Sequence, residues 1–212
     1  MPRRNRVDPW GDLHAVTPRG LFTGNRGCLV DDSGNLVRHH QGSLWIACRT
    51  QFREWQHPLN QPRTWTPLFF LDDAVALAAG HRPCGLCRRA DYLAYRNAVT
   101  VAAGAESPTL AAELNRRLAS ERHRRGRGLA RAADRILWRS DLDTLPAGTV
   151  IGDSVTGASH LVAEHHLQPF SFEGWEPPIE RPRCIEVEVL TPPTSVAALG
   201  NGFAPVLHPT AS

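Results

Sequence analysis

The chain has 212 residues, of which 42% are hydrophobic and 21% charged, a composition typical of globular proteins that bury a core. The formal net charge of +3 does not by itself require a nucleic acid as partner, because the distribution of charge matters more than its sum. No apolar run reaches about 18 residues and the N-terminus lacks the apolar segment of a secretory signal, so we expect no membrane span and a cytoplasmic location.

The first part of the chain predicts short strands. Residues 1–20 are polar and rich in arginine, and they predict a partly ordered arm. Short apolar runs separated by turn residues follow, and they predict a hairpin around DDSGN (31–35) and a further strand over residues 44–48.

Helices are predicted next. The segment LDDAVALAAG (71–80) is typical of a short helix that Asp72 or Asp73 caps and Gly80 ends. Residues 88–103 have apolar side chains at helical spacing, which predicts a second helix. A further helical region begins at Leu110 and is strongly basic in its middle.

The second half of the chain changes character. Residues 145–190 are rich in β-branched and aromatic side chains with frequent glycine and proline, which predicts four or five short strands. TPPTSVAALG (191–200) then predicts a short helix that begins at a proline.

Cysteines carry the clearest chemical signal. Cys84 and Cys87 form a C-x-x-C pair, whose two sulfurs suit a tetrahedral Zn²⁺ ion if two more ligands join them. Cys28 and Cys48 are the candidates, since they belong to the same half of the chain, whereas Cys184 does not and is expected to be a core thiol. A redox pair and simple burial of free thiols are the alternatives. A redox pair would be expected at the start of a helix after a strand, whereas this pair follows a helix that ends at Gly80.

A family resemblance extends this prediction. LFFLDDAVALAAGHRPCGLCRR (68–89) resembles the second half of the zinc domain of the bacterial Ada alkylation-response protein, and WIACRTQF (45–52) matches its first half. In that family a C-R-P-x-C pair supplies the other two ligands, and its first cysteine accepts a methyl group from a DNA phosphotriester. The resemblance therefore implies a zinc cofactor, with Cys48 as the reactive cysteine and Arg49 beside it.

The chain departs from the Ada pattern at one ligand. Phe52 stands where the second cysteine of the C-R-P-x-C pair would be. Cys28 is the candidate substitute, and His39 and His40 are the alternatives. The whole chain also resembles a bacterial family of metal-binding proteins for which no activity is established, through GNRG, WI-x-C and FFLDDA-x-ALAAGHRPC-x-x-CRR.

Two groups of arginines are candidates for phosphate contact, because a guanidinium pairs with phosphate in a bidentate way. One group adjoins the cysteines and the other belongs to the basic helical region, where a solvated helix face is the plainer interpretation. The candidates are Arg49, Arg88, Arg89, Arg122, Arg124 and Arg125. His81, three residues before Cys84, is expected to donate to a cysteine sulfur or to a backbone carbonyl.

Together these signals predict an α+β protein in four parts. These are an arginine-rich arm (1–20), an Ada-like zinc module (21–103), a basic helical connector (104–140) and a small β-rich C-terminal domain (141–212). The predicted function is a zinc-binding protein with a structural Cys₄ site formed by Cys28, Cys48, Cys84 and Cys87, associated with DNA or RNA. The alternatives are an enzyme in which zinc activates Cys48 as an alkyl acceptor, and a structural zinc protein that binds another protein.

Overall fold

The computed structural model describes residues 3–54, 64–122, 135 and 137–212. Within these residues the chain forms two six-stranded sheets and four α-helices, which confirms the predicted α+β class. No helix among the described residues is long and apolar enough to cross a bilayer.

The first sheet is built from the N-terminal part of the chain, and its spatial order is β2-β1-β5-β3-β4-β6. Most neighbouring strands are antiparallel, but β1 pairs with β5 and β4 pairs with β6 in parallel. The bounds of its strands are β1 Arg6–Val7, β2 Leu13–His14, β3 Phe22–Asn25, β4 Ile46–Arg49, β5 Leu68–Phe70 and β6 Arg82–Pro83.

The second sheet lies in the C-terminal half and is entirely antiparallel, with the order β11-β10-β9-β8-β12-β7. A single turn of 3₁₀-helix, Leu142–Thr144, follows its first strand. The bounds of its strands are β7 Trp138–Asp141, β8 Val150–Gly152, β9 Ser159–Val162, β10 His166–Pro169, β11 Ile179–Glu180 and β12 Glu186–Val189.

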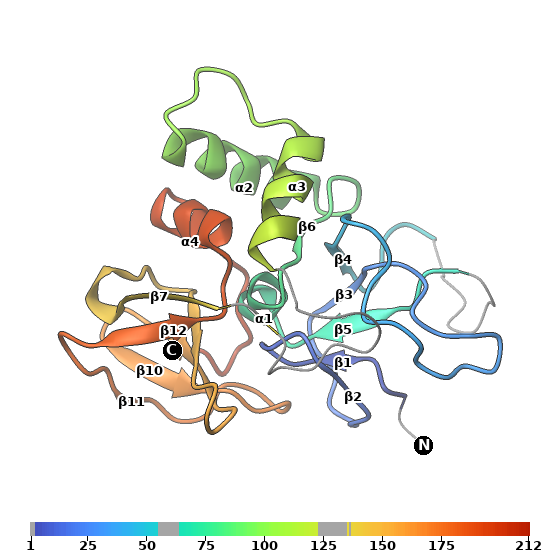
Figure 1. Cartoon of the computed structure of the whole chain (residues 1–212), viewed down its shortest axis with the longest axis horizontal. Helices are drawn as coiled ribbons and strands as arrows, with labels where there is room; N and C mark the ends of the chain where they lie inside the picture. Colours follow the sequence, from blue (N-terminus) through green and yellow to red (C-terminus); the bar gives the residue numbers. More distant parts are fainter. Residues whose placement is uncertain (1–2, 55–63, 123–134, 136) are drawn as a thin grey trace.

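Helix α1 (Asp73–Ala78) occupies the centre of the molecule, between the two sheets (Figure 1). It contacts β5 of the first sheet and β8 of the second, and all of its residues are buried. Four of them are small or medium apolar residues, which allows both sheets to approach the helix closely. As predicted, Asp72 caps the helix, by accepting a hydrogen bond from the Val75 N–H, and Gly80 takes a left-handed conformation just after it.

Three longer helices gather at one end of the molecule (Figure 1): α2 (Arg89–Ala102), α3 (Ala111–Glu121) and α4 (Pro193–Gly200). Helix α4 comes from the C-terminal half but packs on α2 and α3, which come from the N-terminal half. A buried hydrogen bond of 2.8 Å between the hydroxyls of Tyr95 and Ser195 joins α2 to α4.

The two halves share one hydrophobic core. A single cluster of buried side chains contains Leu68 and Phe70 of the first sheet together with Val150 and Leu161 of the second. The predicted boundary between an N-terminal module and a C-terminal domain therefore marks a change in amino-acid composition. It does not separate two hydrophobic cores, because side chains of the C-terminal half complete the core of the N-terminal half.

The predicted arm is wrong, because Arg6–Val7 and Leu13–His14 form strands β1 and β2 of the first sheet. Val7 and Trp10 are 2% and 5% exposed, and the indole N–H of Trp10 donates to the Gly157 carbonyl in the second half. The polar and arginine-rich composition hid these two apolar anchors, because each is a single apolar side chain and not part of an apolar run.

The predicted helical connector (104–140) differs from the structure at its C-terminal end. Helix α3 lies within it, residues 123–134 lie outside the described residues, and Trp138 begins strand β7 instead of ending a helix. Pairing with β12 explains the difference, because Trp138 lies opposite Val189 and its indole N–H donates to the Thr191 carbonyl.

The acidic pair of the LDDA motif ties distant segments to α1. The Asp72 carboxylate accepts hydrogen bonds from the Trp175 indole N–H and the His208 N–H. Its neighbour Asp73 accepts the Val206 N–H, so the C-terminal tail is held against the start of the central helix. Burial raises the pKa of Asp72, and these hydrogen bonds oppose that effect.

Candidate metal centre

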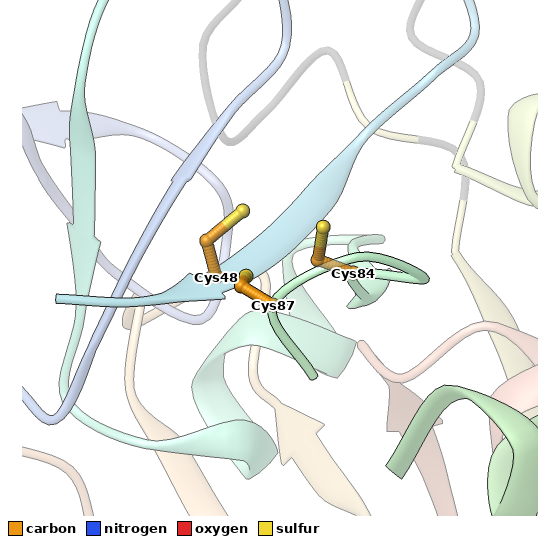
Figure 2. A group of neighbouring side chains, drawn as sticks. All are labelled: Cys48, Cys84 and Cys87. Carbon is orange, nitrogen blue, oxygen red and sulfur yellow. The ribbon is translucent and has the colours of Figure 1, made fainter. Parts of the chain in front are cut away.

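Three cysteines converge at the edge of the first sheet. Cys48 lies on β4, and Cys84 and Cys87 lie on the turn that leads from β6 into α2 (Figure 2). Their sulfur atoms all lie within 4.8 Å of one another. Parallel pairing of β4 with β6 explains the approach, because Ala47 lies opposite Pro83 and accepts the Cys84 N–H at 2.9 Å.

The turn itself orients the sulfurs of Cys84 and Cys87. The Arg88 N–H donates to the Cys84 carbonyl at 3.1 Å, which closes one turn of chain around the C-x-x-C segment. Within this turn the Leu86 N–H points at Cys84 Sγ, at 3.4 Å. Gly85 passes close to the Tyr92 ring, since a Cβ placed there would lie 3.4 Å from it. The local sequence therefore presents both sulfurs to the same side.

Hydrogen bonds give the three thiols unequal acidity. The Cys48 thiol and the N–H groups of Cys87 and Leu86 donate to the Cys84 sulfur, and they lower the pKa of Cys84 to about 5 against the effect of burial. The Cys48 thiol donates to the other two sulfurs and is largely buried, and both effects raise its pKa. These contacts thus favour thiolate character at Cys84 and hold the proton on Cys48.

This arrangement suits a thiophilic metal ion. Zinc–sulfur bonds of about 2.3 Å place tetrahedral sulfurs about 3.8 Å apart, so only a small contraction of the cluster is needed. Arg82 supplies a nearby positive charge that interacts with Cys84 and Cys48. Its guanidinium is positioned by Asn115 Oδ1 at 2.9 Å and lies 4.9 Å from the centre of the Tyr92 ring. Three close cysteines that could hold a metal ion are thus a feature of this fold.

Cys28 does not join the cluster. It follows the end of β3 that pairs with the start of β4, where Asn25 lies opposite Ile46, whereas Cys48 lies opposite Thr23. The strand direction thus carries Cys28 away from the three sulfurs, and its thiol donates to the Val30 carbonyl at 3.4 Å. Of the four predicted ligands, only Cys48, Cys84 and Cys87 therefore come together.

The alternative histidines form a different group, around Trp45. The rings of His39, His40 and His81 lie 5.7, 5.3 and 5.1 Å from the Trp45 ring, centre to centre. None of them belongs to the cysteine cluster. The predicted role of His81 beside a cysteine sulfur is not seen, because its ring packs between Trp45 and Phe70 instead.

His81 predicts a measurable acid sensitivity. Burial holds the pKa of this fully enclosed ring well below 6.5, so the folded chain keeps it neutral while the unfolded chain protonates. Its contribution to stability is complete above pH 6.5 and falls by about 1.4 kcal/mol per pH unit below that value. In His81→Phe, urea unfolding is expected to lose this slope between pH 6.5 and pH 5. The exposed His165→Gln control should keep it, and an unchanged slope in His81→Phe would contradict the assignment.

Two of the predicted phosphate-binding arginines are used inside the fold, which corrects that prediction. Arg88 is 1% exposed, and it pairs with Asp73 at 2.5 and 2.7 Å and with Asp91 at 2.8 Å. Arg122 is 6% exposed and donates to the Gly80 and Ser43 carbonyls. A guanidinium that is buried and paired within the protein is not accessible to a phosphate.

The other predicted arginines have different positions. Arg49 and Arg89 are exposed and adjoin the cysteine cluster, where the Arg49 N–H donates to the Cys87 sulfur. Arg124 and Arg125 lie outside the described residues. Arg82 stands directly before Pro83-Cys84 in the sequence, and this position explains why its guanidinium lies beside the thiols.

Comparisons of the chain with models of protein families, with characterised proteins and with solved structures found no match. The resemblance of residues 45–89 to the Ada zinc domain therefore stays a prediction, and the chemistry of the site has to be argued from its geometry.

Proposed function

We propose that this chain is a zinc-binding protein in which Cys48, Cys84 and Cys87 hold the ion. The convergence of three sulfurs within 4.8 Å, from two segments far apart in the sequence, is the observation that carries the proposal. Bound zinc would fasten the end of β4 to the turn before α2, and thereby fix the start of that helix.

Zinc fits this donor set better than other common ions. Thiolates are soft ligands that magnesium and calcium avoid, and the cytoplasmic location expected from the sequence favours metal binding over disulfides. Three thiolates and one Zn²⁺ carry a net charge of −1, which the nearby Arg82 guanidinium offsets. Three protein ligands leave a fourth position for water or another donor, because no other described residue belongs to the cluster.

Metal analysis of the purified full chain is the direct test. We expect one tightly bound zinc ion per chain, removed by a chelator with a fall in thermal stability and restored by added zinc. Substitution of cobalt should give the intense charge-transfer and d–d absorption of a tetrahedral thiolate site. A folded chain that is free of metal and does not take up zinc would refute the proposal.

We also propose that the surface around this centre contacts nucleic acid. The exposed Arg49 and Arg89 support it, since they adjoin Cys48 and Cys87 and belong to the half of the chain that resembles a DNA-contacting domain. The internal positions of Arg88 and Arg122 make this surface less basic than the sequence suggests, so weak binding is expected.

Salt dependence tests the nucleic-acid contact. In the double variant Arg49→Ala/Arg89→Ala, the slope of log affinity for duplex DNA against log salt is expected to fall by about two, because each lost phosphate contact removes about 0.9. Arg139→Ala, on β7 of the second sheet, serves as the control and should leave the slope unchanged. Binding that is independent of salt, or equal in the double variant and the parent, would argue against this surface.

A further inference from the structure

We propose that peroxide joins Cys48 to Cys84 in a disulfide across strands β4 and β6, and that this oxidation releases the metal ion. The release step rests on the proposed zinc site, whereas the disulfide depends only on the positions of the cysteines. A C-x-x-C sequence alone would favour a bond between Cys84 and Cys87, so the inference comes from the fold.

The backbone already brings Cys48 and Cys84 within bonding range. Strands β4 and β6 run parallel, with Ile46 opposite Arg82 and Ala47 opposite Pro83. One further step in this register places Cys48 beside Cys84. Paired strands lie about 4.8 Å apart, and disulfide-bonded cysteines have Cα atoms about 4.4–6.8 Å apart. The bond can therefore form without separation of the strands.

Contacts between the thiols select the same pair. The Cys48 thiol donates to the Cys84 sulfur, so the two side chains already face each other across the strand pair. The Cys87 sulfur, by contrast, accepts a hydrogen bond from the Arg49 N–H. Cys48 is partly exposed, whereas Cys84 is 7% exposed. A small oxidant can thus reach Cys48, and the strand register places Cys84 beside it.

The chemistry balances with hydrogen peroxide as the oxidant. The thiolate of one cysteine of the pair attacks one peroxide oxygen, so that an S–O bond forms, the O–O bond breaks and hydroxide leaves. The thiolate of the other cysteine then attacks the sulfenic sulfur, which forms the S–S bond and expels the second oxygen as hydroxide. Two protons convert the hydroxides to water, two thiolates are oxidised and one peroxide is reduced. Zinc then keeps only Cys87 of its three cysteine ligands.

The test uses the full chain in a Cys28→Ser/Cys184→Ser background, which removes the two cysteines outside the cluster. Zinc-loaded and metal-free samples are treated with one equivalent of hydrogen peroxide. Released zinc is measured with a chromogenic chelator, and tryptic peptides are mapped by mass spectrometry without reduction. Cleavage after Arg49 and Arg88 puts Cys48 on one peptide and both other cysteines on another, so a cross-strand bond is seen as a link between peptides. Fragmentation of the linked pair identifies the bonded cysteine.

We expect a Cys48–Cys84 link in both samples, and release of one zinc for every two thiols lost, with full recovery after a thiol reductant and zinc. A predominant Cys84–Cys87 or Cys48–Cys87 bond, or oxidation to sulfinic acid without a disulfide, would overturn the inference. Retention of zinc after the link has formed would also overturn the release step. A chain that forms the link but never binds zinc would refute the proposed function and leave the disulfide supported.

Discussion

The Cys84→Ser variant is expected to lose stoichiometric zinc binding, while Cys28→Ser keeps it. Cys84 is the central sulfur of the cluster, since both Cys48 and Cys87 donate to it, and Cys28 lies at the far end of the β3–β4 pair. A structural zinc ion contributes on the order of 10 kcal/mol to folding, so its loss should lower the melting temperature strongly. Zinc content by mass spectrometry and a thermal melt of each variant measure the two effects.

These two variants distinguish a three-cysteine ligand set from a four-cysteine set that includes Cys28. Equal loss of zinc in both variants would restore the four-cysteine set and require a rearrangement of the segment after β3. Cys48→Ser should behave like Cys84→Ser, because it removes the only ligand contributed by β4. If Cys48→Ser retains the ion with unchanged affinity, the C-x-x-C turn binds it without the sheet.

The Arg88→Met variant is expected to destabilise the fold by about 3–5 kcal/mol. Its guanidinium is buried, pairs with Asp73 on α1 and with Asp91 on α2, and lies 3.9 Å from the centre of the Phe22 ring. Removal of one partner of a buried pair leaves the other charge without compensation in a poorly solvated place. Urea unfolding of the zinc-loaded chain measures the change in the free energy of unfolding.

Arg89→Met is the matched control, because Arg89 is the next residue and is exposed. Its substitution should change stability by less than about 0.5 kcal/mol. Zinc content should be equal in the two variants, so that a loss of metal cannot account for the difference. Similar stability of the Arg88 and Arg89 variants would mean that the ion pair between Arg88 and Asp73 makes no net contribution to the free energy of unfolding.

The neighbours Arg88 and Arg89 show why the sequence was ambiguous at this site. The run "CRR" predicts a basic surface, and both residues are chemically suited to phosphate. Helix α2 begins at Arg89, so the two side chains leave the backbone in different directions, one toward Asp73 and one toward solvent. Only the path of the chain distinguishes an internal ion pair from an exposed cation.

Helix ends and helical spacing were predicted well where they depend on residues close together in the sequence. The cap and the glycine end of α1, the helical spacing of α2, and the proline at the start of α4 each depend on residues within one or two turns. The strand β7 was mistaken for the end of a helix, because its pairing with β12 comes from a segment far along the chain.

The sequence by itself determined the α+β class, the central helix and the presence of a C-x-x-C pair, since these follow from spacing along a short stretch. The tertiary structure decided which cysteine joins that pair. Parallel pairing of β4 with β6 brings Cys48 to Cys84, whereas the antiparallel course of β3 carries Cys28 away. It also decided that both halves share one core, because contacts between distant segments depend on the packing of the whole chain.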